Sequence, residues 1–405
     1  MKILFLSQFF WPENFIINDL VRIFSKVKSY EITILTSKPN YPEGKIYKGY
    51  KVYDITKENY FGANLFRVPV LLRKKSFSGL FLNYLSFIIS ATVIAPFLLS
   101  KKRIDIIFVY GTSPILQAIP AIFISFLKKA KLIIWVQDLW PESLEATGYV
   151  RNKYLLSVVR FFVKYIYSKA DLILVQSQAF EKKILSINNK SNILYLPNFA
   201  PSEYERNADF IHKPAYHANE IFEIVYAGNL GRAQNLDVIL KAFNLLTPYT
   251  RIKFYIIGEG SYKENLIKQA NELNLKNVIF VEYLSLNDLK KRIKRSSLLL
   301  LSLKDNEVLN LTIPSKFQAY LTFGKPILVA ANGEISKLIK RSQSGIAVSP
   351  TNEFLIANLI LRFYKMSPMS RAKLALKGLI FYKKNYHSDI IYSKLRHIMF
   401  NLMKS

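Results

Sequence analysis

The sequence predicts an α/β protein built from two doubly wound domains, and three observations support this. At 405 residues the chain is too long for one ordinary hydrophobic core. Short continuous apolar stretches alternate with helical patterns, which is typical of parallel strands covered by helices on both faces. The pattern stops in a polar, proline-containing stretch at 195–220 and then restarts. We therefore expect one domain at 1–205 and a second at 206–385, with ligands in the central cleft that the two domains face.

The expected strands are the short apolar runs of each half. In the first half they are 2–7, 30–37, 105–111, 131–138 and 171–177, and in the second half 222–228, 252–258, 277–283, 298–303 and 326–331. Helical patterns lie between them, beginning with one at 14–26. Strands that are apolar along their whole length indicate parallel sheets rather than half-exposed hairpins.

The composition excludes several kinds of chemistry. The chain has no cysteine, which excludes a disulfide scaffold, a thiolate nucleophile and a zinc–cysteine site. Its four histidines all lie in the second half, from His212 onward. The first half therefore has no imidazole base for serine–histidine chemistry. Hydrophobic residues make up 51% of the chain, which excludes disorder.

The formal net charge of +29 has three interpretations. It can reflect the amino-acid usage of an AT-rich genome, an anionic membrane surface as partner, or nucleic acid. No zinc-finger, helix-turn-helix or RNA-recognition pattern supports the third interpretation. We therefore expect no nucleic-acid partner and leave the first two open.

One long apolar segment interrupts the pattern of strands and helices. Residues 78–99 carry no charge, with Arg73, Lys74 and Lys75 before them and Lys101, Lys102 and Arg103 after them. The segment is long enough to span a bilayer, but a span would separate strands of one sheet. With a second apolar helix near 114–128, it suits shallow insertion into a membrane interface. The alternative is that both are core helices.

The N-terminus is expected to form a buried strand and not a signal peptide, because its apolar run is short and lacks a small-residue cleavage site. We therefore expect a peripheral, monotopic protein on the cytoplasmic face of the inner membrane, in contact with an anionic membrane surface.

Polar residues follow the strand at 131–138. Gln137, Asp138 and Glu142 emerge where active-site groups of parallel sheets gather. Asp138 is equally suited to capping the next helix. Both roles stay open for it on pattern alone.

Two glycine turns follow strands of the second half. Neither is a Walker loop or a dinucleotide fingerprint, and each also occurs for steric reasons alone. Glycine lets the backbone approach a ligand, and an arginine there offers a planar fork to phosphate. The candidate residues of these turns are Gly228, Asn229, Gly231, Arg232, Gln234 and Gly258.

The segment "TIPSKFQAYLTFGKPI" at 312–327 predicts a short helix that opens on a cation. Ser315 is the expected N-cap after Pro314, the helix should run to about Phe323, and Gly324 should end it. The free N–H groups of such a helix start and the charge of Lys316 would favour phosphate. The alternative is an ordinary helix with a solvated lysine.

Together these motifs resemble glycosyltransferase family 4, the retaining enzymes of the GT-B fold, with its two Rossmann-like domains facing a central cleft. The residues carrying the resemblance lie at 36–50, 136–148, 195–199, 226–237 and 312–328. The resemblance implies a nucleotide-sugar donor bound mainly to the second domain and an acceptor bound to the first. It also implies no cofactor, no metal, and a final helix at 386–405 that returns to the first domain.

The chain departs from the wider family at two positions. The family has two glutamates seven residues apart, and here those places hold Leu311 and Ala319. The branch resembling bacterial O-antigen and capsule L-fucosamine transferases often has glutamine followed by alanine or serine there, which fits Gln318 and Ala319. The resemblance therefore moves the ribose contact to Gln318 or to another residue.

Other assignments follow from the same resemblance. Glu13 and Asn14 stand in place of glycines after the first strand and are assigned, with Gln137 and Glu142, to the acceptor side. Asp138 replaces the usual histidine and is assigned, with Lys316 and Arg232, to catalysis. Glu334 is a substitute carboxylate for sugar or ribose.

The expected function is transfer of an amino-deoxy sugar, best N-acetyl-L-fucosamine, from a UDP-sugar donor to a polyprenyl-diphosphate-linked oligosaccharide in O-antigen or capsule biosynthesis. Two alternatives remain. One is a GT-B enzyme similar to UDP-sugar 2-epimerases, which would need several carboxylates and a histidine in the cleft. The other is a binding protein that has lost catalysis, given the missing glutamates.

Overall fold

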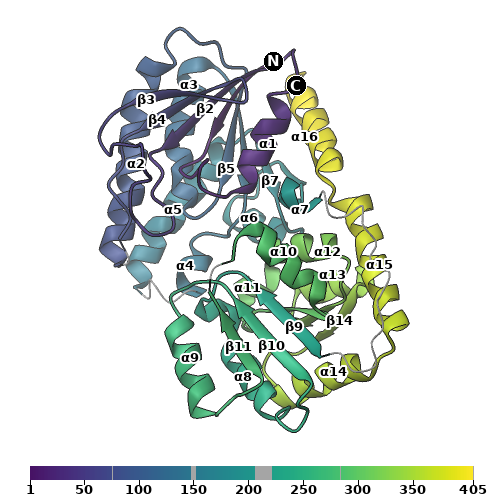
Figure 1. The fold of residues 1–405 in the computed structure, drawn as a ribbon. Coiled ribbons are helices and arrows are strands. Elements are labelled where there is room, and N and C mark those ends of the chain that lie inside the picture. Colours follow the sequence, from purple (N-terminus) through teal and green to yellow (C-terminus); the bar gives the residue numbers. More distant parts are fainter. Residues whose placement is uncertain (75, 147–151, 206–220, 283, 405) are drawn as a thin grey trace. The chain divides into compact units, whose positions relative to one another are not determined.

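The computed structural model describes residues 1–74, 76–146, 152–205, 221–282 and 284–404, and these form two compact units (Figure 1). Unit 1 comprises Met1–Pro197 and Ile391–Ser405, and unit 2 comprises Asn198–Ile390. The change of unit at residue 197 precedes the position expected from the sequence, 205. The final helix, α16 (Ser388–Leu402), belongs mostly to unit 1, where Tyr392 packs edge-on against Phe24 at 4.8 Å between ring centroids.

Unit 1 is built on a sheet of eight strands within the described residues, in the order β3-β4-β2-β1-β5-β6-β7-β8. Every neighbouring pair is parallel except β3 and β4, which form an antiparallel edge. The strands are β1 (Lys2–Leu6), β2 (Glu31–Ser37), β3 (Thr56–Tyr60), β4 (Ala63–Val68), β5 (Ile106–Gly111), β6 (Lys131–Val136), β7 (Leu172–Val175) and β8 (Ile193–Tyr195).

The central strands of this sheet are apolar along their length because helices cover both faces. β5 and β7 are buried at every residue. The helices of unit 1, besides α16, are α1 (Ile16–Phe24), α2 (Phe77–Leu98), the 3₁₀ turn η1 (Ile115–Ala118), α3 (Ile119–Lys128), α4 (Glu142–Ala146), α5 (Lys153–Lys169) and α6 (Ala179–Ile187). α3 packs against both α2 and α5.

Unit 2 contains a parallel sheet with the strand order β11-β10-β9-β12-β13-β14. Numbered within the unit, this is the 3-2-1-4-5-6 order of a doubly wound domain, whose order reverses between β9 and β12. The strands are β9 (Phe222–Ala227), β10 (Ile252–Ile257), β11 (Val278–Val281), β12 (Leu298–Ser302), β13 (Ile327–Ala330) and β14 (Gly345–Val348).

Alternate residues of β12 enter two different hydrophobic clusters. Leu298 and Leu300 pack in one cluster, and Leu299 and Leu301 in the other. Because successive side chains of a strand point to opposite faces, both faces of the sheet are covered. The helical elements of unit 2 are α7 (Ser202–Glu205), η2 (Arg232–Gln234), α8 (Leu236–Asn244), α9 (Lys263–Glu272), α10 (Leu286–Arg295), α11 (Glu307–Leu311), α12 (Ser315–Thr322), α13 (Glu334–Ser342), α14 (Glu353–Lys365) and α15 (Pro368–Asn385).

All ten strands expected from the sequence are present, and four more were missed: β3, β4, β8 and β14. The missed strands are polar, short or interrupted by a charge, as in "TKENY" and "ANLFRV". They lie toward the edges of their sheets. The overall class, two doubly wound α/β domains, is as predicted.

Candidate active site

Lys316 lies in the first turn of α12 and points its amine at the end of β9. Its Nζ lies 3.9 Å from the centroid of the Tyr226 ring and donates hydrogen bonds to the Tyr226 hydroxyl and to Gln234 Oε1, the latter at 3.1 Å. The side chain is half-buried, and burial lowers the pKa of Lys316 to about 7. The solvated-lysine alternative is therefore wrong.

Tyr226 connects three of the predicted residues. Its hydroxyl lies 2.6 Å from the carbonyl oxygen of Asn229 and 3.1 Å from Gln234 Oε1, and it accepts from Lys316. The ring is fully buried, and burial raises the pKa of Tyr226 well above its ordinary value, so the hydroxyl stays neutral. Lys316, Asn229 and Gln234 are thus held by one tyrosine that the sequence reasoning did not select.

Close packing requires the glycines that follow β9 and β10. Gly228 has a φ of +139°, and a Cβ there would lie 2.3 Å from Lys316 Cε. Gly258 has a φ of +141°, and its Cβ would lie 2.0 Å from the carbonyl oxygen of Gly228. The two turns therefore stack with the amine of Lys316 above the first of them. A side chain at Gly228 would displace that amine.

Tyr320 fixes α12 onto β9. Its hydroxyl accepts a hydrogen bond from the backbone N–H of Ala227 at 2.9 Å and lies 3.3 Å from the carbonyl oxygen of the same residue. Both tyrosines of the site lay inside apolar patterns, as a strand residue and a helix residue. Their role in the site becomes visible only from the hydrogen bonds of their hydroxyls to residues in distant parts of the chain.

The start of α12 differs from the prediction. Pro314, not Ser315, occupies the N-cap position, and no side chain caps the helix. Ser315 is the first helical residue and is exposed. The first backbone N–H groups of α12 therefore lack a side-chain partner and suit an anion. Gly324 has the left-handed φ of +59° expected after a helix end.

The other predicted donor residues lie at the same carboxyl edge with different exposure. Arg232 is exposed, with its guanidinium 5.2 Å from the centroid of the Tyr262 ring. Gly231 and Asn229 belong to the same loop. Glu334 is the first residue of α13 and pairs with Lys337 at 2.6 Å. Gln318 is fully buried, and its amide atoms have no hydrogen-bond partner among the described residues.

In unit 1, Asp138 follows β6 and faces the end of β5. The backbone N–H of Ser113 hydrogen-bonds to the carboxylate, yet burial is the larger effect and raises the pKa of Asp138 to about 6. The Trp140 indole N–H donates to the hydroxyl of the same serine at 3.0 Å. Asp138 lies four residues before α4, outside its N-cap position. The capping alternative is therefore wrong.

Two further residues assigned to the acceptor side, Gln137 and Glu142, have structural partners. Gln137 is buried, and its backbone N–H donates to Gly111 at 3.0 Å. Glu142 is buried, with Arg160 at 3.9 Å. Asn14 is exposed before α1.

Glu13 is the most constrained of these residues. Its carboxylate accepts from the backbone N–H groups of Phe10, Asn40 and Tyr41 at 2.7–3.1 Å. Burial raises the pKa of Glu13 to about 7, against the effect of these donors. The carboxylate holds the loop after β1 against the loop after β2.

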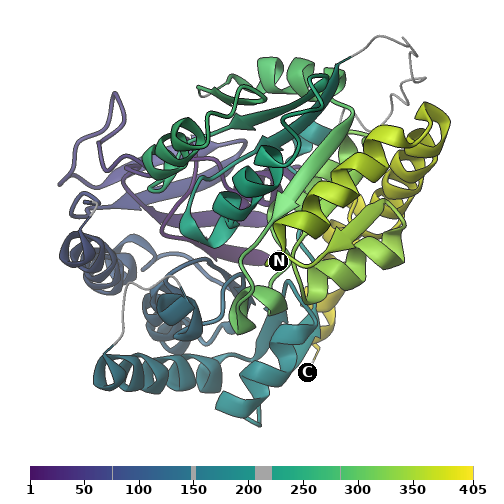
Figure 2. The same cartoon turned by 90° about the horizontal axis from the view of Figure 1, so that it is seen from below.

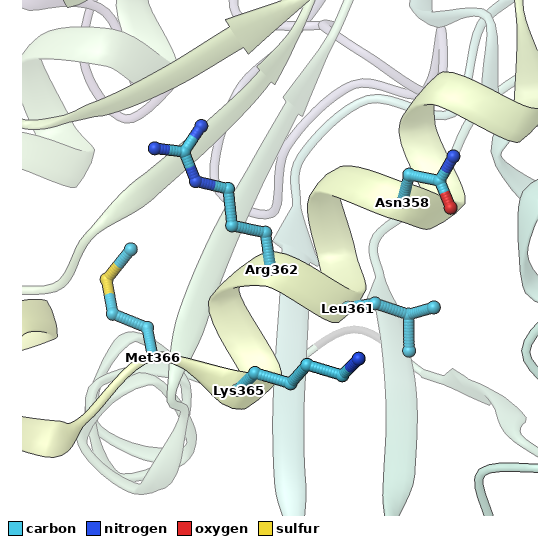
Figure 3. Close-up of a pocket in the computed structure, with 5 residues that line it drawn as sticks. All are labelled: Asn358, Leu361, Arg362, Lys365 and Met366. Carbon is cyan, nitrogen blue, oxygen red and sulfur yellow. The ribbon is translucent and has the colours of Figure 1, made fainter.

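A shallow pocket lies elsewhere on unit 2, on the last turns of α14. Figure 3 shows the residues that line it, Asn358, Leu361, Arg362, Lys365 and Met366. The C-terminal end of α14 lies beside Phe222, the first residue of β9, whose ring contacts Tyr364. This pocket is therefore at the amino edge of the sheet, away from Lys316 and the glycine turns.

Comparison with known proteins identifies the kind of enzyme. Residues 207–377, which lie within unit 2, match the family model described as "Glycosyl transferases group 1". The chain is a glycosyltransferase, and its second unit is similar to the group 1 family. The match contains Lys316, Tyr226, Gln234 and the glycine turns, so the geometry around Lys316 belongs to the part of the transferase that the family model covers.

Similar proteins agree with this. The transferase is 22% identical over 334 residues to WcaI of Escherichia coli K12, a protein given a role in colanic acid biosynthesis as a glycosyl transferase, and the match covers 79% of this chain and 80% of WcaI. Sucrose-phosphate synthase from Thermosynechococcus elongatus has a TM-score of 0.70 at 13% identity, covering 100% and 99% of the two chains. Anabaena HepE in complex with UDP has a TM-score of 0.64 at 14% identity, covering 99% and 100%. The solved structures show the shared GT-B fold.

Proposed function

We propose that this transferase moves an amino-deoxy sugar from a UDP-sugar to a polyprenyl-diphosphate-linked oligosaccharide during surface polysaccharide assembly, with N-acetyl-L-fucosamine as the best donor sugar. The position of the Lys316 amine is the main support for a nucleoside-diphosphate-sugar donor. This amine lies above Gly228 and has no acid partner among the described residues. The similarity to WcaI and to a UDP-bound GT-B protein supports the pathway and the nucleotide.

The proposed reaction needs a cation for the leaving group. The bond between the anomeric carbon and the phosphate oxygen breaks, the acceptor hydroxyl oxygen bonds to that carbon, and the hydroxyl proton passes to the leaving phosphate. Negative charge grows on the diphosphate, and preorganised donors stabilise it. Lys316, the N–H groups of α12 and the exposed Arg232 are these donors in our proposal. Asp138 orients acceptor hydroxyls, and Glu334 the sugar or ribose.

Among the described residues, no group of three or more His, Asp or Glu side chains could hold a metal ion. Lys316 and Arg232 are both cations, which suits direct binding of the diphosphate. We therefore expect turnover to continue in EDTA.

Tyr226→Phe should raise the KM for donor about fivefold and change kcat less. The ring, and with it the cation–π contact, remains, whereas the hydroxyl that bridges Lys316 to Asn229 and Gln234 is lost, worth about 1 kcal/mol. Steady-state kinetics against donor concentration measure this. Tyr249→Phe, in the same unit, is the control. An unchanged KM for Tyr226→Phe would contradict the positioning of Lys316 by Tyr226.

Donor affinity should fall as pH rises above about 7. Below that pH the Lys316 amine is charged before donor binds, and above it the empty site holds a neutral amine that must take up a proton, because the pKa is lowered to about 7. The dissociation constant should rise by up to about tenfold per pH unit. Tyr226 does not titrate in this range, since its pKa is raised.

Calorimetry with an intact UDP-sugar, from about pH 6 to about pH 8.5, measures this dependence. Proton uptake follows from the heat of binding in buffers of different ionisation enthalpy. In the Lys316→Ala variant the dissociation constant for donor should no longer depend on pH in this range. A wild-type affinity that is constant with pH would show that Lys316 does not meet the diphosphate.

The acceptor class rests on the outer surface of unit 1. The stretch Ser78–Leu98 is long and apolar enough to cross a membrane, but only 28% of it is buried. β4 before it and β5 after it belong to the same sheet, so a span would divide that sheet. A pure core helix does not account for the exposure, and a helix lying in an interface does.

Three helices contribute to this surface, which we call the apolar face. α3 contacts α2 and α5, and the blue and teal helices of unit 1 are seen together in Figure 2. The most exposed members are Phe97 of α2, Phe126 of α3 and Tyr154 of α5, at 76%, 80% and 86%. The sequence predicted a helical pattern between the strands at 131–138 and 171–177, but it did not assign α5 to a membrane surface. Further exposed apolar residues are Phe81, Leu82, Leu85, Ile89, Val93, Phe123, Leu127, Leu155, Val158, Phe161, Phe162 and Tyr165.

Cations accompany the apolar face, which favours an anionic lipid surface. Lys101 and Arg103 follow α2, Lys129 follows α3, and Arg160 and Lys164 lie on α5, all exposed. This pattern suits the peripheral location on the cytoplasmic face of the inner membrane that we propose, where a lipid-linked acceptor is available.

Measuring UDP release from a panel of UDP-sugars, with and without polyprenyl-diphosphate-linked acceptor, tests the proposal. Release that depends on acceptor, with transfer of the sugar, is the expected result. Release without acceptor would indicate hydrolysis or epimerisation, and binding without release would indicate a non-catalytic protein. Either outcome would overturn the proposed function.

A further inference from the structure

Arg73 lies just before α2, and its guanidinium lies over an aromatic ring. Its Cζ is 5.1 Å from the centroid of the Tyr41 ring, and Nη1 donates to the Tyr84 hydroxyl at 3.3 Å. The backbone N–H of Arg73 donates to Asn40 Oδ1 at 3.1 Å. Within the described ranges no carboxylate lies at ion-pair distance from Arg73. The side chain is fixed, and most of its N–H donors are left for an external acceptor.

Neighbouring cations in the same region are neutralised inside the protein. Arg67 is fully buried, pairs with Glu58 at 2.8 Å, and donates to two backbone carbonyl oxygens. The buried Lys38 amine lies 2.5 Å from the Asp54 carboxylate. Arg73 differs from both, because tyrosines rather than acids hold it.

The contacts of Asn83 place the N-terminal end of α2 at the carboxyl edge of the sheet. This buried side chain donates to Asn40, which follows β2, and to the carbonyl oxygen of Leu71. It accepts from Gln8, which follows β1, at 2.9 Å. Asp138, which follows β6, lies at the same edge. The cations after α2, at 101–103, precede β5 and therefore lie at the opposite edge.

We propose that Arg73 binds the diphosphate of the membrane-borne acceptor, an inference that rests on the proposed function. A lipid whose chain contacts the exposed apolar residues of α2 has its headgroup near one end of that helix. Only the N-terminal end shares the edge at which Asp138 is placed. A guanidinium binds phosphate oxygens through a planar fork, and the contacts with the Tyr41 ring and the Tyr84 hydroxyl hold that fork in place.

Vesicle binding tests this without any donor. Neutral phosphatidylcholine vesicles are compared with the same vesicles carrying a polyprenyl diphosphate, and with vesicles carrying phosphatidylglycerol. Wild type should gain affinity from the diphosphate, and Arg73→Gln should lose about tenfold of that gain. The control, Lys101→Gln with Arg103→Gln at the other end of α2, should keep the gain and lose affinity for phosphatidylglycerol.

Other results of the vesicle experiment would contradict the assignment of Arg73 or the proposed acceptor. A full diphosphate gain in Arg73→Gln would overturn the assignment of Arg73. An equal loss on diphosphate and phosphatidylglycerol would show a general headgroup contact and also overturn it. Absence of any gain in wild type would instead count against the proposed acceptor. Arg73→Lys, which keeps the charge without the fork, should fall between wild type and Arg73→Gln, and unchanged thermal unfolding shows that the variants fold.

Discussion

Lys316→Ala should reduce kcat/KM about 10²–10³-fold while the protein stays folded, the size of effect typical of removing one preorganised donor from a developing oxyanion. The amine lies above Gly228 and beside Tyr226 and has no acid partner in the described part of the chain. Its loss removes a cation from the proposed diphosphate position and removes no ion pair. Initial rates of sugar transfer with saturating acceptor measure the effect.

The control for this variant is Lys268→Ala. Lys268 lies in the same unit on α9 and is well exposed, so the net charge changes equally. Its activity should stay near wild type, because exposed ion pairs contribute little. Thermal unfolding should be similar for both variants. Near-normal activity of Lys316→Ala would remove Lys316 from the phosphate site and with it the main support for the donor class.

Replacing Ile89, Val93 and Phe97 with glutamine should release the protein from anionic vesicles, lowering the partition coefficient roughly 100-fold. The three side chains recur every four residues on the exposed side of α2. Each contributes about 1 kcal/mol on partial insertion into the interface, and 1.4 kcal/mol corresponds to tenfold. Co-sedimentation with phosphatidylglycerol vesicles measures the change.

Two comparisons make this result specific. Phe354→Gln with Ile380→Gln changes exposed apolar residues of unit 2 and should leave vesicle binding unchanged. Binding of the UDP-sugar in solution should be the same in both variants. Substitution of Phe87, which is fully buried, would test stability instead, because its loss leaves a cavity. Persistent vesicle binding by the α2 variant would show that another surface meets the membrane.

Much of the fold could be predicted because burial on both faces leaves a simple pattern. "DIIFVYG" and "LLLLSL" are apolar throughout, and each forms a strand of a parallel sheet. β3 was missed because it is polar, and β14 because it has only four residues; both lie at the edge of a sheet. The pattern is strong where solvent is excluded and weak where one edge remains open.

The candidate site could be predicted in part. Glycine turns and a lysine at a helix start carry a local signal, since both follow from backbone geometry. Tyr226 carried none, because a tyrosine in a buried strand is ordinary core until its hydroxyl is seen to meet Lys316. The sequence suggested that Gln318 could contact the ribose, yet its side chain is fully buried. Ser315 looked like a cap, yet Pro314 holds that position.

The sequence by itself determined the doubly wound class, the two domains, and the cation at 316 beside glycine turns, because these depend on hydrophobic periodicity and short-range geometry. The tertiary structure decided which groups meet: Tyr226 under Lys316, the Ser113 backbone N–H on Asp138, and Arg73 against Tyr41. It also decided that α5 joins the apolar face. Such contacts join residues far apart in the chain, and only packing specifies them.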